Sequence, residues 1–228
     1  MKKRLIALCL ALCLIFAEAS AEKVFAPETA KEGKRQAVQC LLECGFSSEY
    51  GGDDKLSRWE EDISIYIGGE ATREDIEKVD SFIMELSFRI PFLPPITRVE
   101  EENDANVKMY FVPLDEMGQY VGGYEEGNWG FGTHYWMDYV RYEGEVGVCS
   151  DVTNQIQRNH LIMEELIAVI GMTNDHYCYE DSIIYQPWTE TQELSELDWL
   201  MLNMMYHPHL APGMTAEEAE GILMNIIE

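Results

Sequence analysis

Basic residues are scarce in this sequence. Only 16 Lys and Arg stand against 42 Asp and Glu among 228 residues, giving a formal net charge of −26 at pH 7. Such a surface repels nucleic acid and anionic membranes, so we expect neither as a partner. It suits cationic partners or divalent cations, and it also serves simply to keep a protein soluble. No D-x-[DN]-x-[DN]-G calcium loop is present.

Long apolar runs are absent beyond the N-terminus. A basic start at Lys2–Arg4, an apolar run from Leu5 to Phe16 and the small residues Ala19–Ala21 predict a signal peptide over residues 1–21. This run is too short to remain as a membrane anchor, and no later stretch predicts a transmembrane helix. We therefore expect cleavage after Ala21 and export to the periplasm or the outside of the cell.

Cysteine is also infrequent. Four cysteines remain after the predicted cleavage: Cys40, Cys44, Cys149 and Cys178. An even number in an exported chain allows two disulfides, with three possible connectivities. Cys149 and Cys178 border the central apolar stretch, which makes their pairing plausible. Because no C-x-x-C pair exists, we do not expect these cysteines to bind zinc.

The pattern of apolar residues predicts an α+β domain over residues 55–228, preceded by a partly flexible segment over residues 22–54. Strands are predicted at 63–67, 96–99, 106–112 and 145–149, and helices at 36–44, 72–88, 158–170, 194–206 and from 215 onward. Asp151 or Thr153 is expected to cap the helix over 158–170. The result is a small mixed sheet with a central helix and C-terminal helices.

Residues 115–135 are rich in glycine and aromatic residues and predict a long irregular segment or an edge hairpin. Their aromatic rings could line a cleft or could pack the hairpin itself. Gly122-Gly123 is no phosphate loop, because no Lys-Ser/Thr follows it. No G-x-S-x-G is present, so serine catalysis has little support.

The central stretch from Arg158 to Asp175 places Glu164 and Glu165 inside an otherwise apolar run. A helix that is apolar all round is normally buried, and ionised carboxylates in it are costly unless they are paired, hydrogen-bonded or bound to a metal. The two acids therefore mark the candidate site.

This stretch resembles the H-E-x-x-H-x-x-G-x-x-H helix of metzincin-type zinc peptidases. Glu165 stands at the glutamate position and Gly171 at the glycine position. The turn Ser182–Tyr185 is similar to their S-I-M-Y turn, and Leu194 to Asp198 is similar to the L-S-x-x-D start of their closing helix. The resemblance implies a zinc-peptidase scaffold.

The three histidine positions carry Glu164, Ala168 and Asn174 instead, and alanine cannot hold a metal. The resemblance therefore implies a pseudoenzyme-like protein that binds a protein, a peptide or a cell-envelope ligand, or serves as a structural protein. The alternative is a hydrolase in which Glu165 is the general base. Glu165 would work either with Glu164 as a carboxylate pair or with a metal ion such as zinc, held in a rebuilt site by weak ligands. The weak ligands are His160, Glu164, Asp175 and His176.

Residues 55–215 more closely resemble a bacterial family of exported proteins of unknown function. That family carries E-E-L, then L-G-L-x-N-D, D-S-I-F-Y-Q and L-Y-H-P-x-L-x-P-G-M. This chain has Glu164–Leu166, Gly171–Asp175, Asp181–Gln186 and Tyr206–Met214 at those places. The resemblance places Ala168, Gly171, Asn174, Asp175, Ser182 and Tyr185 at the cleft or at its turns.

Overall fold

The computed structural model describes residues 27–46, 54–177 and 179–227. The predicted signal peptide and Cys178 lie outside the described residues, so the predicted cleavage and the pairing of Cys149 with Cys178 also lie outside them. No helix in the described ranges is long and apolar enough to cross a membrane.

A mostly parallel sheet forms the centre of the fold. In the described chain it has six strands: β1 (Arg58–Trp59), β2 (Ile63–Gly69), β3 (Ile96–Val99), β4 (Val107–Val112), β5 (Gly130–Met137) and β6 (Val140–Cys149). The order β1-β6-β4-β2-β3 is parallel throughout, and β5 pairs antiparallel with β6 at the edge. The predicted α+β class is confirmed.

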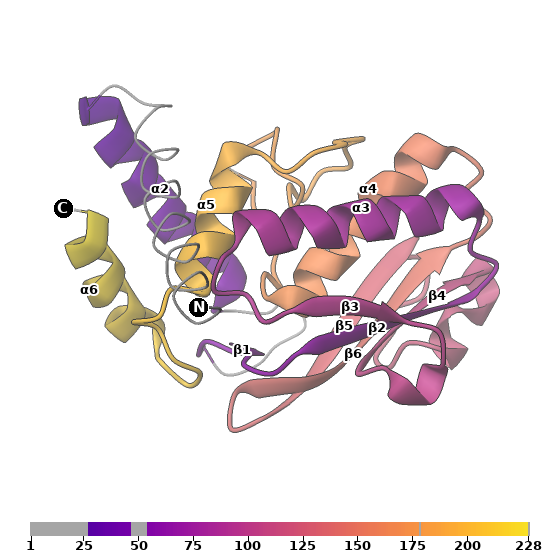
Figure 1. Cartoon of the computed structure of the whole chain (residues 1–228). Helices are drawn as coiled ribbons and strands as arrows, with labels where there is room; N and C mark the ends of the chain where they lie inside the picture. The colour runs from indigo at the N-terminus through magenta and orange to yellow at the C-terminus, as the bar shows by residue number, and fades with distance from the viewer. Residues whose placement is uncertain (1–26, 47–53, 178, 228) are drawn as a thin grey trace, which may run out of the picture.

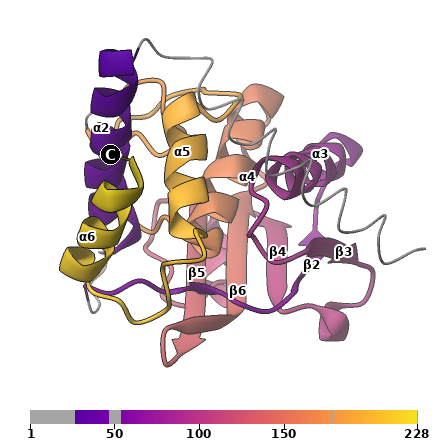
Figure 2. The same cartoon turned by 60° about the vertical axis from the view of Figure 1, so that its left-hand side comes forward.

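The helices gather on one face and at one end of this sheet. They are α2 (Pro27–Gly45), α3 (Arg73–Arg89), α4 (Gln155–Ile170), α5 (Glu196–Met205) and α6 (Ala216–Ile227), with short 3-10 helices η1 (Glu102–Asp104) and η2 (Leu114–Gln119). Figure 1 shows α3 and α4 over the sheet and α2, α5 and α6 at one end. Figure 2 shows α4 between α5 and α3.

Alternation along the strands gives the sheet two buried faces. Met109 and Phe111 of β4 join the main core under the helices, while Tyr110 and Val112 pack with Met117 in a smaller cluster on the opposite face. Successive side chains of a strand point to opposite faces, which explains this division.

Helix α3 begins as the sequence predicts, and its first turn is tied to α4. Thr72 and Asp75 form a capping box. Asp75 is fully buried and also accepts hydrogen bonds from the guanidinium of Arg158, one of them from Nε at 2.9 Å. Gln155 donates to the same carboxylate. The ion pair therefore fixes the start of α4 against the start of α3.

Helix α2 begins at Pro27, earlier than the start near residue 36 that the pattern predicted. Ala37, Val38 and Leu41 are fully buried in the main core, where α2 packs on α5 and α6. The packed unit therefore extends to the N-terminal side of residue 55.

The N-cap of α4 differs from the expected residues. Asn154 caps the helix by accepting a hydrogen bond from the Ile156 N–H at 3.0 Å. Asp151 instead accepts from the N–H of Leu114, at the start of η2, and Thr153 is exposed. The prediction of Asp151 or Thr153 as the cap was wrong, because a contact distant in the sequence already uses Asp151.

The C-terminal end of α4 is held by side chains from β1, β6 and α5. The buried guanidinium of Arg141 donates to three carbonyl oxygens, those of Ala168, Val169 and Gly171. Trp59 Nε1 also donates to the Val169 carbonyl at 2.9 Å, and the Tyr206 hydroxyl donates to the Ile170 carbonyl at 2.7 Å. These groups satisfy carbonyls that a helix end leaves without intrahelical partners, and the cation is favourable at this pole.

Residues 115–135 divide into η2, a loop and the start of β5, so the predicted edge hairpin is present, formed by β5 and β6. Strand β6 starts at Val140 rather than near residue 145, because its first residues pair with both β5 and β1. The antiparallel strand β5 lies alongside α4, and Gly130 and Gly132 stand at its closest points to that helix.

Candidate functional site

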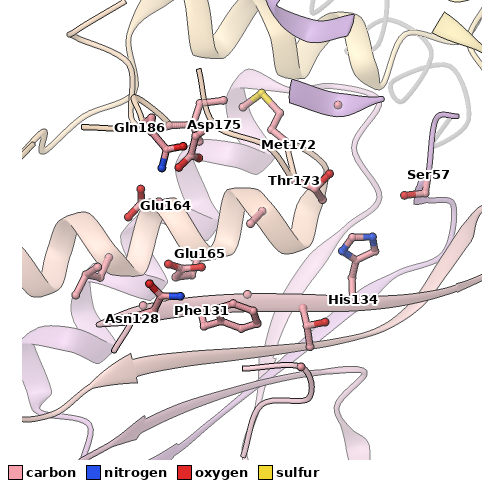
Figure 3. Close-up of a pocket in the computed structure, with 18 of the residues that line it drawn as sticks. Ser57, Asn128, Phe131, His134, Glu164, Glu165, Met172, Thr173, Asp175 and Gln186 are labelled. Carbon is pink, nitrogen blue, oxygen red and sulfur yellow. The ribbon is translucent and has the colours of Figure 1, made fainter. Parts of the chain in front are cut away.

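A cavity of about 580 Å³ lies between α4, β5 and the segments that follow α4. Its lining includes residues of α4 and of the loop after it, two glycines of β5 and several aromatic rings: Glu164, Glu165, Ala168, Asp175, Gly130, Gly132, Trp129, Trp136, Tyr139 and Trp188. Figure 3 shows this region. Glu164, Glu165 and Ala168 are all among its lining residues.

Glu164 and Glu165 face different parts of this cleft. In Figure 3, Glu164 points toward Asp175 and Gln186, whereas Glu165 lies toward Asn128 and Phe131. Neighbouring helix positions are about 100° apart on a helix, so two consecutive residues can reach two walls of one cavity.

Burial and the negative charge of Asp175 raise the pKa of Glu164 from its ordinary value to about 8. The Glu164 side chain is 20% exposed, and its Oε2 lies 3.6 Å from Nε2 of His160, one turn earlier on α4. At neutral pH the protonated form of Glu164 therefore predominates when the cleft holds no counter-charge.

His160 is buried, and its Nδ1 lies 3.1 Å from the Thr191 carbonyl oxygen. Only a protonated Nδ1 can donate to this oxygen, so in the neutral ring Nε2 carries the lone pair that faces Glu164. Burial lowers the pKa of His160, against smaller opposing effects of the Thr191 hydrogen bond and of Glu190. The imidazole is accordingly an uncharged neighbour for Glu164.

Asp175 reaches Glu164 because the loop after α4 is held in two places. The N–H groups of Thr173 and Asn174 donate to the Cys44 carbonyl on α2. His176 N–H donates to the Ile184 carbonyl, and Gln186 N–H donates to the His176 carbonyl. These bonds place Asp175 and Gln186 side by side over α4 (Figure 3).

Glu165 lies where β5 comes closest to α4. A methyl group on Gly130 would overlap the Glu165 carboxylate, and one on Gly132 would come within 2.9 Å of the Glu165 backbone oxygen. Glycine at both positions is therefore what allows the edge strand to approach the acid. These two glycines were not predicted as site residues, although the G-F-G spacing within the aromatic segment was an available signal.

The turn over Ser182–Tyr185 is fixed by a buried aspartate. The Ser182 hydroxyl donates to Asp198 Oδ1 at 2.6 Å, and the Ile183 N–H donates to Oδ2 at 3.1 Å. Asp198 also forms the capping box of α5 with Ser195. Burial raises the pKa of Asp198, although these hydrogen bonds oppose the rise. Ser182 is therefore a structural residue that brings Ile184 into the cavity wall.

Other predicted site residues lie beside the cleft rather than in it. Asn174 turns toward α2, where its side-chain amide donates to the Glu43 carbonyl at 3.3 Å. His176 is buried, and its ring packs against those of Tyr179 and Tyr185. Gly171 ends α4, where a Cβ would overlap Met205 of α5.

The residues present do not fit a zinc ion. Ala168, which lines the cavity, offers no donor atom, and the side chain of Asn174 turns away from the cavity toward α2. Among residues 27–46, 54–177 and 179–227, no three His, Cys, Asp or Glu side chains come together in a group that could hold a metal. Zinc needs three such ligands and an open position for water.

Exposed rings stand at both ends of the cleft. At one end Trp129 and Trp188 meet edge to face, with ring centres 5.7 Å apart. At the other end Trp136 stacks on Tyr139 at 4.6 Å, and Lys55 Nζ lies 5.0 Å from the centre of the Tyr139 ring. The rings of residues 115–135 do both things, because Trp129 lines the cleft while Tyr124, in the loop before β5, packs edge to face against Phe131 of β5.

His134 of β5 lines the cleft toward Ser57 (Figure 3). Burial and the neighbouring Arg141 cation lower the pKa of His134 to about 2. Its ring is therefore neutral across the physiological range and adds a polar but uncharged group to the lining.

These features define an α+β protein with an acidic cleft, walled by aromatic rings, between a central helix and an antiparallel edge strand. The chain belongs to the family of proteins of unknown function designated DUF2927, whose model matches residues 34–225. Among curated proteins, the comparison finds no match.

Proposed function

We propose that this protein is exported, has a metzincin-like scaffold without the three-histidine zinc site, and uses the cleft to bind a ligand. The main support is that Ala168 lines the cavity. It stands where the resemblance to zinc peptidases expects the second histidine, and its side chain has no donor atom for a metal. An intact cleft with no possible second ligand favours binding over zinc-dependent hydrolysis.

Several features support the scaffold. A strand, a helix and further strands precede the central helix, and an antiparallel edge strand runs beside it. Gly171 ends that helix, and the Ser182–Tyr185 turn is fastened to Asp198 at the start of the closing helix. This is the chain order that the resemblance implies.

Metal analysis of the purified mature chain tests the proposal. After incubation with excess zinc and gel filtration, we expect far less than one zinc per chain. The Glu165→Gln variant should fold as the parent chain does and should leave the zinc content unchanged. One tightly held zinc per parent chain would refute the proposal.

A second candidate is a metal-free hydrolase, favoured by the raised pKa of Glu164. A protonated Glu164 would be the general acid, and an ionised Glu165 would be the general base that activates water. Labelled casein is a suitable first peptide substrate. Turnover that Glu165→Gln abolishes, and that Glu196→Gln on exposed α5 surface leaves unchanged, would favour this candidate over the binding function.

A further inference from the structure

We propose that the end of the cleft formed by Trp129, Trp188 and Glu164 binds an organic cation, an ammonium or guanidinium group carried on an alkyl chain. This inference rests on the proposed binding function and names the chemistry of its ligand. It uses three independent features of one cavity: its open volume, the arrangement of its rings and its carboxyl groups.

The two indole rings form a partly exposed corner of the cavity. Trp188 meets Trp129 at an interplanar angle of 78° and meets the His160 ring at 72°, with ring centres 5.7 and 5.3 Å apart. Trp129 is 45% exposed and Trp188 is 49% exposed, and both line the cavity. Perpendicular aromatic faces around an open space are the arrangement that holds alkylated ammonium groups in aromatic cages.

This corner has an acid but no cation of its own. The ring of His160 contacts Trp188 on one side, and its Nε2 lies 3.6 Å from the Glu164 carboxyl group. Asp175 faces Glu164. Among the described lining residues Lys55 is the only Lys or Arg, and it lies over Tyr139 at the opposite end. In the described chain, no Lys or Arg is placed over Trp129 or Trp188.

The charge of the whole chain acts in the same direction. A net charge of −26 raises the local concentration of cations, and a cleft lined by one sign of charge concentrates this field. The opposite end of the cleft already contains a contact between a cation and an aromatic ring, because Lys55 Nζ lies 5.0 Å from the centre of the Tyr139 ring.

Binding of a cation in this corner should also be coupled to the ionisation of Glu164. A cation favours the ionised form of Glu164, so binding should release a proton near neutral pH and should strengthen as pH rises from 6 to 9. The groups that face Glu164 are the carboxyl group of Asp175 and the neutral ring of His160. Glu165 follows on α4, and Glu190 acts on His160 from the segment before α5.

The test is a titration of the mature protein followed by the indole N–H signals in ¹H–¹⁵N NMR spectra. The probes are n-butylammonium, n-butylguanidinium and the neutral n-butanol, all at constant ionic strength. We expect the two cations to shift the Trp129 and Trp188 signals saturably and n-butanol to leave them nearly unchanged. Equal shifts with n-butanol, or no shift with either cation, would overturn the proposal.

Matched variants locate the effect. Trp188→Ala and Glu164→Gln should each weaken n-butylammonium binding at pH 8 by about tenfold. Trp136→Ala removes the same kind of ring from the other end of the cleft and should change the affinity by less than about twofold. A loss with Trp136→Ala as large as with Trp188→Ala would refute the assigned position.

Two further probes distinguish the source of the cation, an N-acetyl-lysine amide and glucosamine. Tighter binding of the lysine probe indicates a polypeptide side chain, and tighter binding of glucosamine indicates an amino sugar. Failure of all cationic probes would leave the cleft a binding site for an uncharged ligand. The metal analysis would still test the proposed function in that case.

Discussion

Gly130 of the edge strand lies so close to Glu165 of the central helix that a single methyl group at position 130 would overlap the carboxylate. Strand β5 and helix α4 meet at the site because of this pair. The mutual position of strand and acid is therefore encoded by the absence of a side chain, and it can be tested by adding one.

Gly130→Ala should destabilise the protein by about 1–3 kcal/mol, because Glu165 must move or the strand must withdraw. The penalty should shrink in a Glu165→Ala background, where the overlapping atoms are gone. Urea unfolding of the two single variants and the double variant gives the coupling energy. Additive effects would contradict the contact.

Gly221→Ala provides the control for this series. A Cβ at Gly221 meets no atom within 4 Å, and the residue lies in helix α6. This change should therefore stabilise the chain by about 0.5–1 kcal/mol through helix propensity.

Glu164 should make the protein less stable as pH rises. Its folded pKa is about 8, above the ordinary 4.5, so the folded state holds a proton that the unfolded state has lost between these two values. Stability therefore falls from pH 4.5 to pH 8. Glu164→Gln should remove the fall, adding on the order of 2 kcal/mol at pH 8 and little at pH 4. Unfolding free energies at both pH values check this, and a gain equal at the two would contradict it.

The buried pair between α3 and α4 should carry a large energetic effect. Asp75→Ala leaves the Arg158 guanidinium buried without its carboxylate and should cost about 3–5 kcal/mol. Glu77→Ala on the same helix breaks an exposed pair with Arg73 and should cost less than about 0.5 kcal/mol. Comparable losses in thermal or urea unfolding would show that the buried pair is not special.

The loss of stability at acidic pH should depend on the carboxylate of Asp75. Burial raises the pKa of Asp75, but hydrogen bonds from Arg158, Gln155 and Thr72 outweigh it and lower the pKa below its usual value. The stability from Asp75 is therefore present above the unfolded pKa and is lost as pH falls through the folded pKa. Asp75→Asn should flatten the acid limb of the stability curve.

A zinc site should be obtainable in this cleft with two substitutions. Glu164 and Ala168 stand one turn apart, both line the cavity, and Asp175 faces Glu164. The pair Glu164→His and Ala168→His, with Asp175 as third ligand, should bind one zinc per chain.

Stability provides the readout for this double variant. Zinc at 100 times its dissociation constant should stabilise the folded state by about 2.7 kcal/mol, and a chelator should reverse the effect. Adding Asp175→Ala should weaken zinc binding, and the parent chain should not respond. If zinc does not stabilise the double variant, the result would argue against the metzincin-like geometry.

Where the signals were local, the sequence predicted the elements well. Thr72 with Asp75 three residues later marks the start of α3, and Ser195 with Asp198 marks the start of α5. Each capping box is complete within four residues, so no knowledge of the rest of the chain is needed.

Strand β5 shows why the remainder could not be read locally. Its glycine and aromatic composition has no clear alternation, and the segment becomes a strand because it pairs with β6. The N-cap of α4 also depends on a distant contact. Asp151 has a suitable side chain for capping, but its carboxylate accepts a hydrogen bond from the Leu114 N–H at the start of η2 instead.

For the site, the sequence offered Glu164 and Glu165 as candidates and the rings of residues 115–135 as one possible lining, but it did not indicate that Trp188 joins them. Glu164, Glu165 and Ala168 could be found because they stand in one helical frame. Trp129 and Trp188 come from segments far apart in the chain, and only the packed structure brings their rings together.

The contacts of Arg141 have a consequence for the speed of ligand binding. Three carbonyls at the end of α4 are held by a guanidinium whose burial lowers its pKa to about 10, so the anchor stays charged at neutral pH. These hydrogen bonds hold the end of α4, which lines the cleft, in place, so we expect no slow rearrangement before binding. Association should follow a single exponential whose rate rises linearly with ligand concentration.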